Sequence, residues 1–260
     1  MNYLQLSDRN SIEFGTDLET EWNDFEYFIA GTTNTAGQQR PDFRRNDTVN
    51  GSLASVFASF TTQPLNRLTL TLGSRLNYNT YNEDLNIAPR TQLRYQLSQR
   101  LALTGAAGIY YQTLPRYLLS QNEQIADLRS TRASHLIGGI DYQLSRDTKL
   151  TLEAFNKEYF NAPVLPAANN VGDRSYVLDN AGAFYEFLED DGRAYARGVE
   201  MLIQKKLAVN FYGMFSASYF RTRYRDFNGE ELNRNFDNRY LLSFIGGYRP
   251  NDVWELSLRW

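Results

Sequence analysis

The chain has 260 residues, of which 42% are hydrophobic and 14% aromatic, so it carries enough apolar material to fold and intrinsic disorder is excluded. A net charge of −3 gives no basic surface for nucleic acid. With no Cys and one His, His135, the chain lacks thiol nucleophiles, disulfides and Cys-based zinc sites, and His-dependent catalytic triads have a single possible base. We therefore expect no enzyme activity and no cofactor.

Two kinds of targeting or membrane segment are missing from the sequence. The longest uncharged run, Leu101 to Pro115, is too short for a membrane-spanning helix and contains Thr, Gln and Tyr. Residues 1–10 lack the apolar core of a signal peptide. The chain is therefore expected either to be cytoplasmic or to lack its natural beginning.

Alternation of apolar and polar residues recurs along the whole chain. It is clearest at 67–80, where Leu68, Leu70, Leu72 and Leu76 share one face and polar residues the other. The same period predicts eleven strands, at 11–30, 51–62, 67–80, 87–97, 101–113, 133–145, 148–161, 194–206, 208–224, 237–249 and 253–260.

The connections between these strands alternate in length. Those at 31–50, 114–132, 162–193 and 225–236 are long, the one at 81–86 is shorter, and the rest are tight turns. Outer-membrane β-barrels have this pattern, with long extracellular loops and short periplasmic turns. Nine tyrosines and tryptophans lie on apolar faces near strand ends, as in an aromatic girdle, namely Tyr78, Tyr95, Tyr111, Tyr142, Tyr219, Tyr240, Tyr248, Trp254 and Trp260.

A soluble antiparallel sandwich or propeller would show the same alternation, with its apolar face in a core. Predicted strands of 12 to 20 residues are longer than is usual in such sheets, however. The favoured fold class is therefore all-β, an antiparallel transmembrane β-barrel.

Several segments resemble the barrel of TonB-dependent outer-membrane receptors, the energised importers of siderophores, cobalamin and glycans. The carrying segments are IEFGTDLE from Ile12, TLTLGSRLNYNTYN from Thr69, IAPRTQLRYQLSQRLALTGAAGIYYQ from Ile87, HLIGGIDYQLSRDTKLTLEAFNKEYFNAP from His135, ARGVEMLIQKKL from Ala196 and RNFDNRYLLSFIGGYRPNDVWELSLRW from Arg234. Their order and spacing match along nearly the whole chain.

The resemblance implies a parent barrel of about 22 strands, preceded by a plug domain and a short TonB-contacting segment. Neither precedes Met1. We expect residues 1–260 to be a partial barrel domain without its plug, about 11 strands of that barrel. In isolation it would form an open curved sheet with unpaired edges near 11–30 and 253–260.

The function implied by the resemblance is that of a nutrient receptor in the Gram-negative outer membrane. Its ligand would be a ferric siderophore, cobalamin or a glycan, and TonB would act only through the missing plug domain. Other expected partners are outer-membrane lipid and lipopolysaccharide. Two alternatives stay open: a passive porin or channel, and a soluble β-sandwich or propeller that binds carbohydrate.

Two predicted loops carry candidate ligand-binding residues. Arg40, Phe43, Arg44 and Arg45 belong to the sequence RPDFRR, whose planar guanidinium groups suit an anionic ligand, lipopolysaccharide phosphates, or simple solvation of the loop. The aromatic stretch 174–187 offers Tyr176 and Tyr185, which could stack on a sugar or catecholate or pack on a neighbouring loop.

Other polar groups favour structural roles. Glu13, Asp17, Glu19 and Glu21 would line one strand face about 7 Å apart, suited to pairing with arginines of neighbouring strands or of a plug. The acidic turn at 188–198 lacks the register of a calcium loop. His135 has no second His to hold a metal and is expected to be a hydrogen-bonded rim residue.

Overall fold

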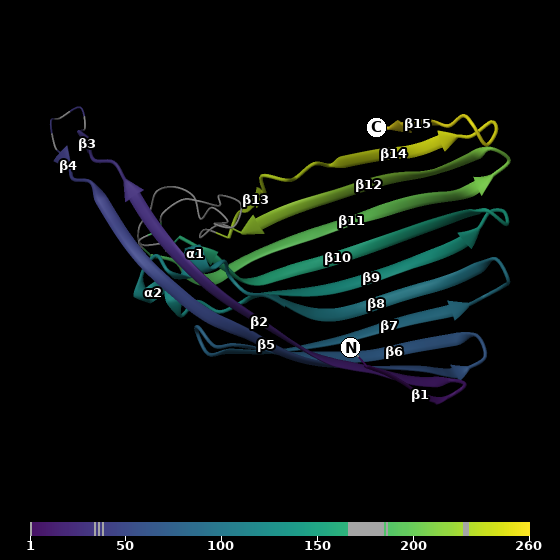
Figure 1. The fold of residues 1–260 in the computed structure, drawn as a ribbon, viewed down its shortest axis with the longest axis horizontal. Helices are drawn as coiled ribbons and strands as arrows, with labels where there is room; N and C mark the ends of the chain where they lie inside the picture. Colours follow the sequence, from purple (N-terminus) through teal and green to yellow (C-terminus); the bar gives the residue numbers. More distant parts are fainter. Residues whose placement is uncertain are drawn as a thin grey trace.

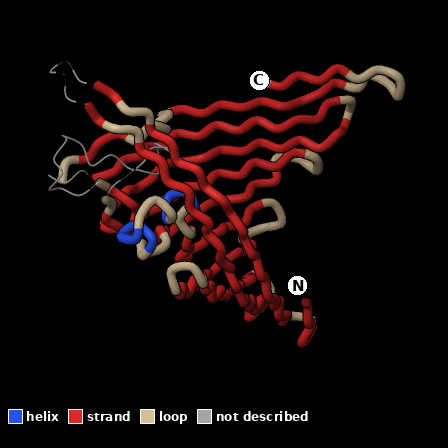
Figure 2. Tube along the Cα trace, turned by 60° about the vertical axis from the view of Figure 1, so that its left-hand side comes forward, coloured by secondary structure: helices blue, strands red, loops and turns tan. Residues whose placement is uncertain are grey.

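The computed structural model describes residues 2–33, 35, 37, 39–165, 185, 187–225 and 229–260. Thirteen strands form one antiparallel sheet, and strands that follow one another along the chain lie side by side in it. The order is β1-β2-β5-β6-β7-β8-β9-β10-β11-β12-β14-β15, and β13 pairs with the last residues of β12, on the same side as β14. Figures 1 and 2 show that the sheet is curved and open, with β1 at one end and β15 at the other.

The strands are long and the helices are short. The bounds are β1 Asn2–Ser7, β2 Asn10–Ile29, β3 Thr32–Thr33, β4 Gln39–Arg40, β5 Phe43–Leu65, β6 Leu68–Asn79, β7 Asp84–Gln96, β8 Leu101–Gln112, α1 Arg116–Leu119, α2 Glu123–Ala126, β9 Thr131–Gln143, β10 Thr148–Val164, β11 Glu189–Ala208, β12 Phe211–Arg225, β13 Glu231–Asn233, β14 Tyr240–Tyr248 and β15 Leu256–Arg259.

The open curved sheet confirms the predicted fold class, and each of the eleven predicted strands is present. Two further strands of this sheet, β1 and β13, and the two strands of the separate β3–β4 ribbon were not predicted, because each is too short for a clear alternation. The N-terminal edge differs from the prediction as well. β1 covers β2 only as far as Phe14, so from Gly15 onward the described part of β2 has a strand on one side alone.

The prediction of one long loop at 31–50 was wrong in part. β2 and β5 stay paired up to Ile29 and Phe43, so residues 43–50 are strand. The alternation there places polar residues on both faces, and apolar periodicity therefore gave no signal. This extended hairpin crosses in front of the sheet in Figure 1 and ends in the small β3–β4 ribbon.

The two faces of the sheet are distinguished by the connection between β8 and β9. Tyr117 of α1 and Gln121, between α1 and α2, contact β2 and β5, which lie several strands away in the sheet. They can do so only from the concave side. That face carries Asp17 and Glu21 of β2, and the strand register extends it over Arg75 of β6 and Arg90 of β7.

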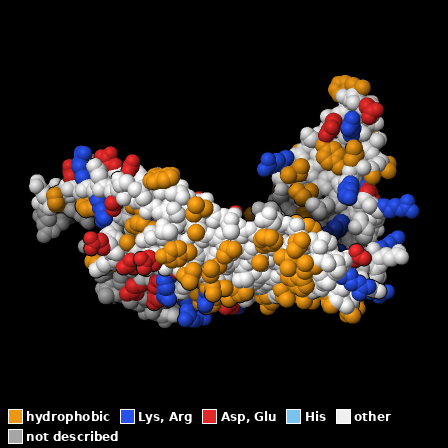
Figure 3. All heavy atoms as spheres, turned by 60° about the horizontal axis from the view of Figure 1, so that its bottom comes forward, with side chains coloured by type: hydrophobic (Ala, Val, Ile, Leu, Met, Phe, Trp, Pro, Cys, Tyr) orange, Lys and Arg blue, Asp and Glu red, His pale blue; other side chains and the backbone are white. Residues whose placement is uncertain are grey.

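The opposite, convex face is apolar and uncovered in the described part of the chain. Leu18, Trp22 and Leu136 have exposed fractions of 74%, 76% and 63%. Figure 3 shows hydrophobic side chains gathered across the middle of this surface and charged ones toward both ends. Burial of apolar area is the main stabilising term in folding, at about 25 cal/mol per Å². A wall of this kind is suited to a hydrocarbon environment, where its apolar band is covered by lipid.

Candidate functional site

Carboxylates and arginines pair across strands on the concave face. The Asp17 carboxylate lies 2.8 Å from the Arg75 guanidinium, and the Glu21 carboxylate lies 3.2 Å from that of Arg116. Both pairs agree with the expectation that the acidic row of β2 faces arginines. Further along the wall, Asp141 contacts Arg94 and, at 3.0 Å, Lys149.

The β8–β9 connection is folded inward and fastened to the extended hairpin. The Tyr27 hydroxyl of β2 donates to the carbonyl of Tyr117 and lies 3.0 Å from Ser120 Oγ. Arg45 of β5 donates to the carbonyl of Gln121 and lies 3.0 Å from the Asp47 carboxylate. The β8–β9 connection therefore covers the concave side of the sheet at the end of the strands where the long connections lie.

Arg116 is the most enclosed charged group of this contact. Its side chain is 11% exposed, pairs with Glu21 and lies 5.1 Å over the ring of Tyr81. It passes close to the backbone of Gly51, where a Cβ would lie 2.7 Å from a guanidinium nitrogen. Because Gly51 has no side chain, the Arg116 guanidinium can lie against β5, and a larger residue at position 51 would displace it.

A small hydrophobic core stabilises the inward fold. It joins α1 and α2 to the segment that precedes β11, and Leu118 and Ile125 within it are 2% and 0% exposed. The members are Leu114, Leu118, Leu119, Ile125, Leu128 and Leu188, with Tyr81, Tyr117, Leu165 and Tyr185 packed against them. Asn122 caps α2 by accepting the Ile125 amide at 3.0 Å. The described residues at the ends of the β10–β11 connection thus pack against the β8–β9 connection.

The candidate residues of RPDFRR do not form one loop cluster, which corrects the prediction. Phe43, Arg44 and Arg45 lie on β5, where successive side chains point to opposite faces. Arg45 is on the concave side against Gln121, whereas Arg44 lies on the other face, 4.5 Å over the Phe28 ring. Phe43 pairs with Ile29 on the same face as Arg45, and Arg40 ends β4 at the hairpin tip.

The aromatic candidates have different positions. The Tyr185 amide donates to Gln121 Oε1 at 2.7 Å, and its ring packs on the small core. Burial raises the pKa of its phenol, and neighbouring Tyr117 adds to the rise. Tyr185 therefore packs against the β8–β9 connection. Tyr176 lies outside the described residues.

His135 belongs to a cluster that sequence reasoning missed. Its ring centroid lies 4.4 Å from that of Tyr110, over which the Arg90 guanidinium lies at 4.9 Å. Strand register brings them together, because Arg90 pairs with Gly108 and Gly108 with His135. The only sequence signal was that each residue falls on a polar face. Lys157, the register partner of His135, adds another cation beside this cluster.

Within the described ranges, no group of three or more His, Cys, Asp or Glu side chains could hold a metal ion. No helix of that part of the chain is long and apolar enough to cross a membrane.

A curved antiparallel wall with one apolar face, one charged face and an inward-folded β8–β9 connection is typical of a transmembrane β-barrel. The model for the TonB dependent receptor-like β-barrel matches residues 2–260, and the chain belongs to this family.

Solved structures share the fold at low sequence identity. The outer membrane transporter YddB from Escherichia coli matches with a TM-score of 0.67 and 12% identity, covering 100% of this chain. The ferric-catecholate import receptor Fiu from K12 E. coli gives 0.66 and 11% over 96% of the chain. The ferripyoverdine receptor of Pseudomonas aeruginosa, bound to ferripyoverdine, gives 0.69 and 12% over 98%.

The chain spans only part of these relatives, namely 40%, 41% and 36% of the three solved chains. No curated protein matches the sequence significantly.

Proposed function

We propose that residues 1–260 are part of the barrel domain of an outer-membrane receptor that binds a scarce nutrient for TonB-energised uptake. The observation that carries the proposal is the inward-folded β8–β9 connection, fastened through Arg116, Arg45 and Tyr27 over a charged concave wall. A passive channel needs an open path, whereas a receptor needs a structured surface at the entrance. Binding sites are commonly built on loops placed by a rigid scaffold.

The nutrient class that fits best is a ferric siderophore, with cobalamin or a glycan as alternatives. Arg90, Tyr110 and His135 offer a cation and two rings on the concave face, a combination suited to an anionic aromatic group. Of the earlier candidates, Arg45 and Tyr185 act by positioning the connections. Arg40, Phe43, Arg44 and Tyr176 stay candidates for direct ligand contact.

The proposed location is the outer membrane of a Gram-negative bacterium, with outer-membrane lipid and lipopolysaccharide against the apolar face. Coupling to TonB would be made by a plug domain outside this barrel segment. The family model that matches residues 2–260 describes a barrel alone, which supports assigning the TonB contact to a separate plug domain.

The test is uptake of an ⁵⁵Fe-loaded siderophore panel by a Gram-negative strain that lacks or regains the complete protein. We expect uptake of at least one siderophore to require both the protein and TonB. Uptake that persists without TonB would favour the passive porin instead. A detergent-free, monodisperse monomer of the 260-residue chain would support the soluble alternative and contradict a membrane wall.

A further inference from the structure

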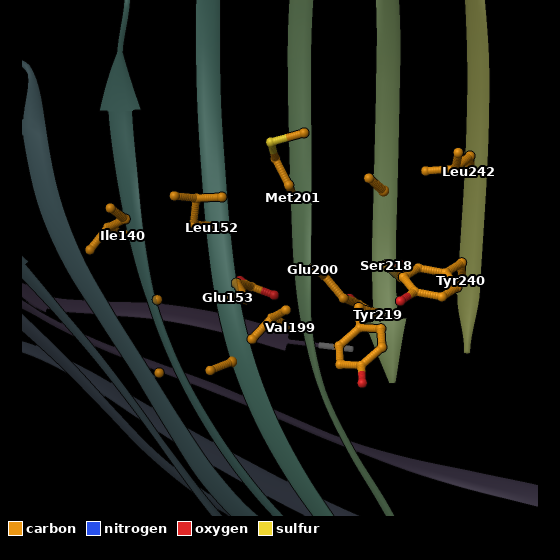
Figure 4. A pocket seen from close by; sticks show the side chains of 14 residues that line it. Ile140, Leu152, Glu153, Val199, Glu200, Met201, Ser218, Tyr219, Tyr240 and Leu242 are labelled. Carbon is orange, nitrogen blue, oxygen red and sulfur yellow. The ribbon is translucent and has the colours of Figure 1, made fainter. Parts of the chain in front are cut away.

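The two faces of the wall carry hollows of opposite chemistry. The hollow in Figure 4 lies on the convex face and is lined by apolar side chains such as Leu152, Val199 and Met201, so it is part of the apolar band. A cavity of about 270 Å³ lies on the concave face, where the β8–β9 connection joins the wall. This connection cavity is lined mainly by polar residues, among them Arg75, Asn77, Arg90, Thr113 and Ser130.

The connection cavity has a positive charge without a matching negative one. Arg75 is already paired with the Asp17 carboxylate at 2.8 Å. Arg90 lies over the Tyr110 ring but has no hydrogen bond or ion pair in the described part of the chain. None of the described lining residues is Asp or Glu. A guanidinium group in this setting favours an anion, because its planar N–H donors match the oxygens of a carboxylate or phosphate.

Neutral donors lie around the same space. Ser130, the last residue of the connection, is 2% exposed, and its Oγ has no hydrogen-bond partner among the described residues. The Ser130 amide donates to the Asp84 carboxylate at 2.9 Å, which fixes the residue beside the cavity. The Asn77 amide oxygen accepts from Arg75 Nε at 2.8 Å, so the NH2 group of Asn77 is left as a donor. A buried hydroxyl without a partner is destabilising, and a ligand that accepts its hydrogen bond removes that cost.

The size of the connection cavity selects a small anion. Ala88, which lines it from β7, is 1% exposed, so the space is closed on the wall side. Pockets for drug-sized ligands have about 300–1,000 Å³, and a water molecule takes up about 30 Å³ of liquid. The cavity, at about 270 Å³, therefore fits an ion such as phosphate with a few waters and is too small for a whole iron–siderophore complex.

We propose that the connection cavity binds a small oxyanion, which fastens the β8–β9 connection to the wall. The oxygens of the anion accept hydrogen bonds from the Arg90 guanidinium on β7 and from Ser130 Oγ at the end of the connection. The anion is either a free ion such as phosphate or a carboxylate arm of the nutrient, since both present the same oxygens to these donors. The inference rests on the proposed function, because a firmly held connection gives the entrance its structured surface.

The test is calorimetric titration of the complete receptor, purified in mild detergent, with inorganic phosphate and separately with citrate. Arg90→Gln should weaken anion binding at least tenfold, because charge-assisted hydrogen bonds are the stronger ones. Ser130→Ala removes one neutral donor and should weaken it about threefold. Arg146→Gln is the matched control and should bind as wild type, since Arg146 is an exposed arginine in the β9–β10 turn, at the opposite end of the strands.

Amide exchange tests whether the anion fastens the connection. At an anion concentration about ten times its dissociation constant, the amides of residues 128–130 should exchange about tenfold more slowly, because opening there releases the anion. Arg90→Gln should lose this effect at the same concentration. Tighter binding of phosphate than of citrate would assign a free ion, and the reverse would assign a carboxylate arm.

Heat-modifiable mobility on gels identifies the folded variants, and only those are compared. Binding of neither anion to the wild-type receptor would mean that the cavity holds water alone and would overturn the proposal. Equal binding by wild type, Arg90→Gln and Ser130→Ala would overturn it as well, and so would binding that leaves exchange at 128–130 unchanged. Siderophore uptake is measured separately: uptake that persists while neither anion binds contradicts this inference and leaves the proposed function standing.

Discussion

Adjacent glycines on β9 face opposite sides of the wall and should respond oppositely to substitution. A Cβ at Gly139 would lie 2.7 Å from the Leu152 carbonyl oxygen and 2.9 Å from Thr104 Oγ1, whereas one at Gly138 meets nothing within 4 Å. Since backbone cannot yield easily, Gly139→Ala should destabilise the folded barrel by about 1–3 kcal/mol. Gly138→Ala should change it by less than about 0.5 kcal/mol. Urea unfolding of the complete protein in lipid vesicles measures both, and equal midpoints for the two variants would contradict the close packing at Gly139.

Asp147, in the turn between β9 and β10, should titrate at unusually low pH. Hydrogen bonds from Lys205 and then Ser145 lower the pKa of its carboxyl to about 2. Because this pKa lies below the usual value near 4, the interaction stabilises the folded turn above about pH 4. That contribution is lost as the pH falls through about 2.

A carboxyl ¹³C NMR titration measures this shift directly. Lys205→Met should move the Asp147 midpoint up toward its usual value. Lys206→Met is the control, since only the Lys206 backbone contacts this turn, through its amide on the Asp147 carbonyl. A wild-type midpoint near 4 would refute the proposed pairing.

At the scale of the element, Arg116 is expected to hold the β8–β9 connection inside the barrel. Replacing it by Met removes the pair with Glu21 and the contact with Tyr81. The local opening free energy of residues 116–128 should fall by about 1–3 kcal/mol, seen as about 5- to 150-fold faster amide exchange. Arg146→Met should leave exchange there unchanged. Equal protection in both variants would mean that the hydrophobic core holds the connection without Arg116.

The elements also show which parts of the fold were predictable. Strands such as β6 alternate Leu with polar residues, so their period marks them. The parts of β2 and β5 nearest the hairpin tip carry polar residues on both faces. They are strands because their backbones hydrogen-bond to each other, and backbone pairing leaves no apolar pattern in the sequence. The site was less predictable still. Arg116 and Glu21 are 95 residues apart in sequence, and only the curvature of the sheet brings them together.

At the scale of the whole molecule, the described sheet has two open edges. β2 from Gly15 to Ile29 has β5 on one side and no strand on the other in the described structure, and β15 pairs with β14 alone. In an antiparallel strand the N–H groups point alternately to the two sides. Every second amide of an edge strand therefore lacks a strand partner, which hydrocarbon does not tolerate.

If the chain is part of a closed barrel, those amides must be paired in the complete protein. Hydrogen exchange of the intact receptor in lipid nanodiscs should then protect successive amides of β2 between Gly15 and Trp22 as strongly as those of β6, a central strand. Between Trp22 and the hairpin tip, the convex face carries Asp24 and Glu26. Protection of the amides should therefore decline in that part of β2, where the hairpin leaves the membrane. Fast exchange at every second residue from Gly15 to Trp22, with β6 fully protected, would show that the wall stays open at this edge.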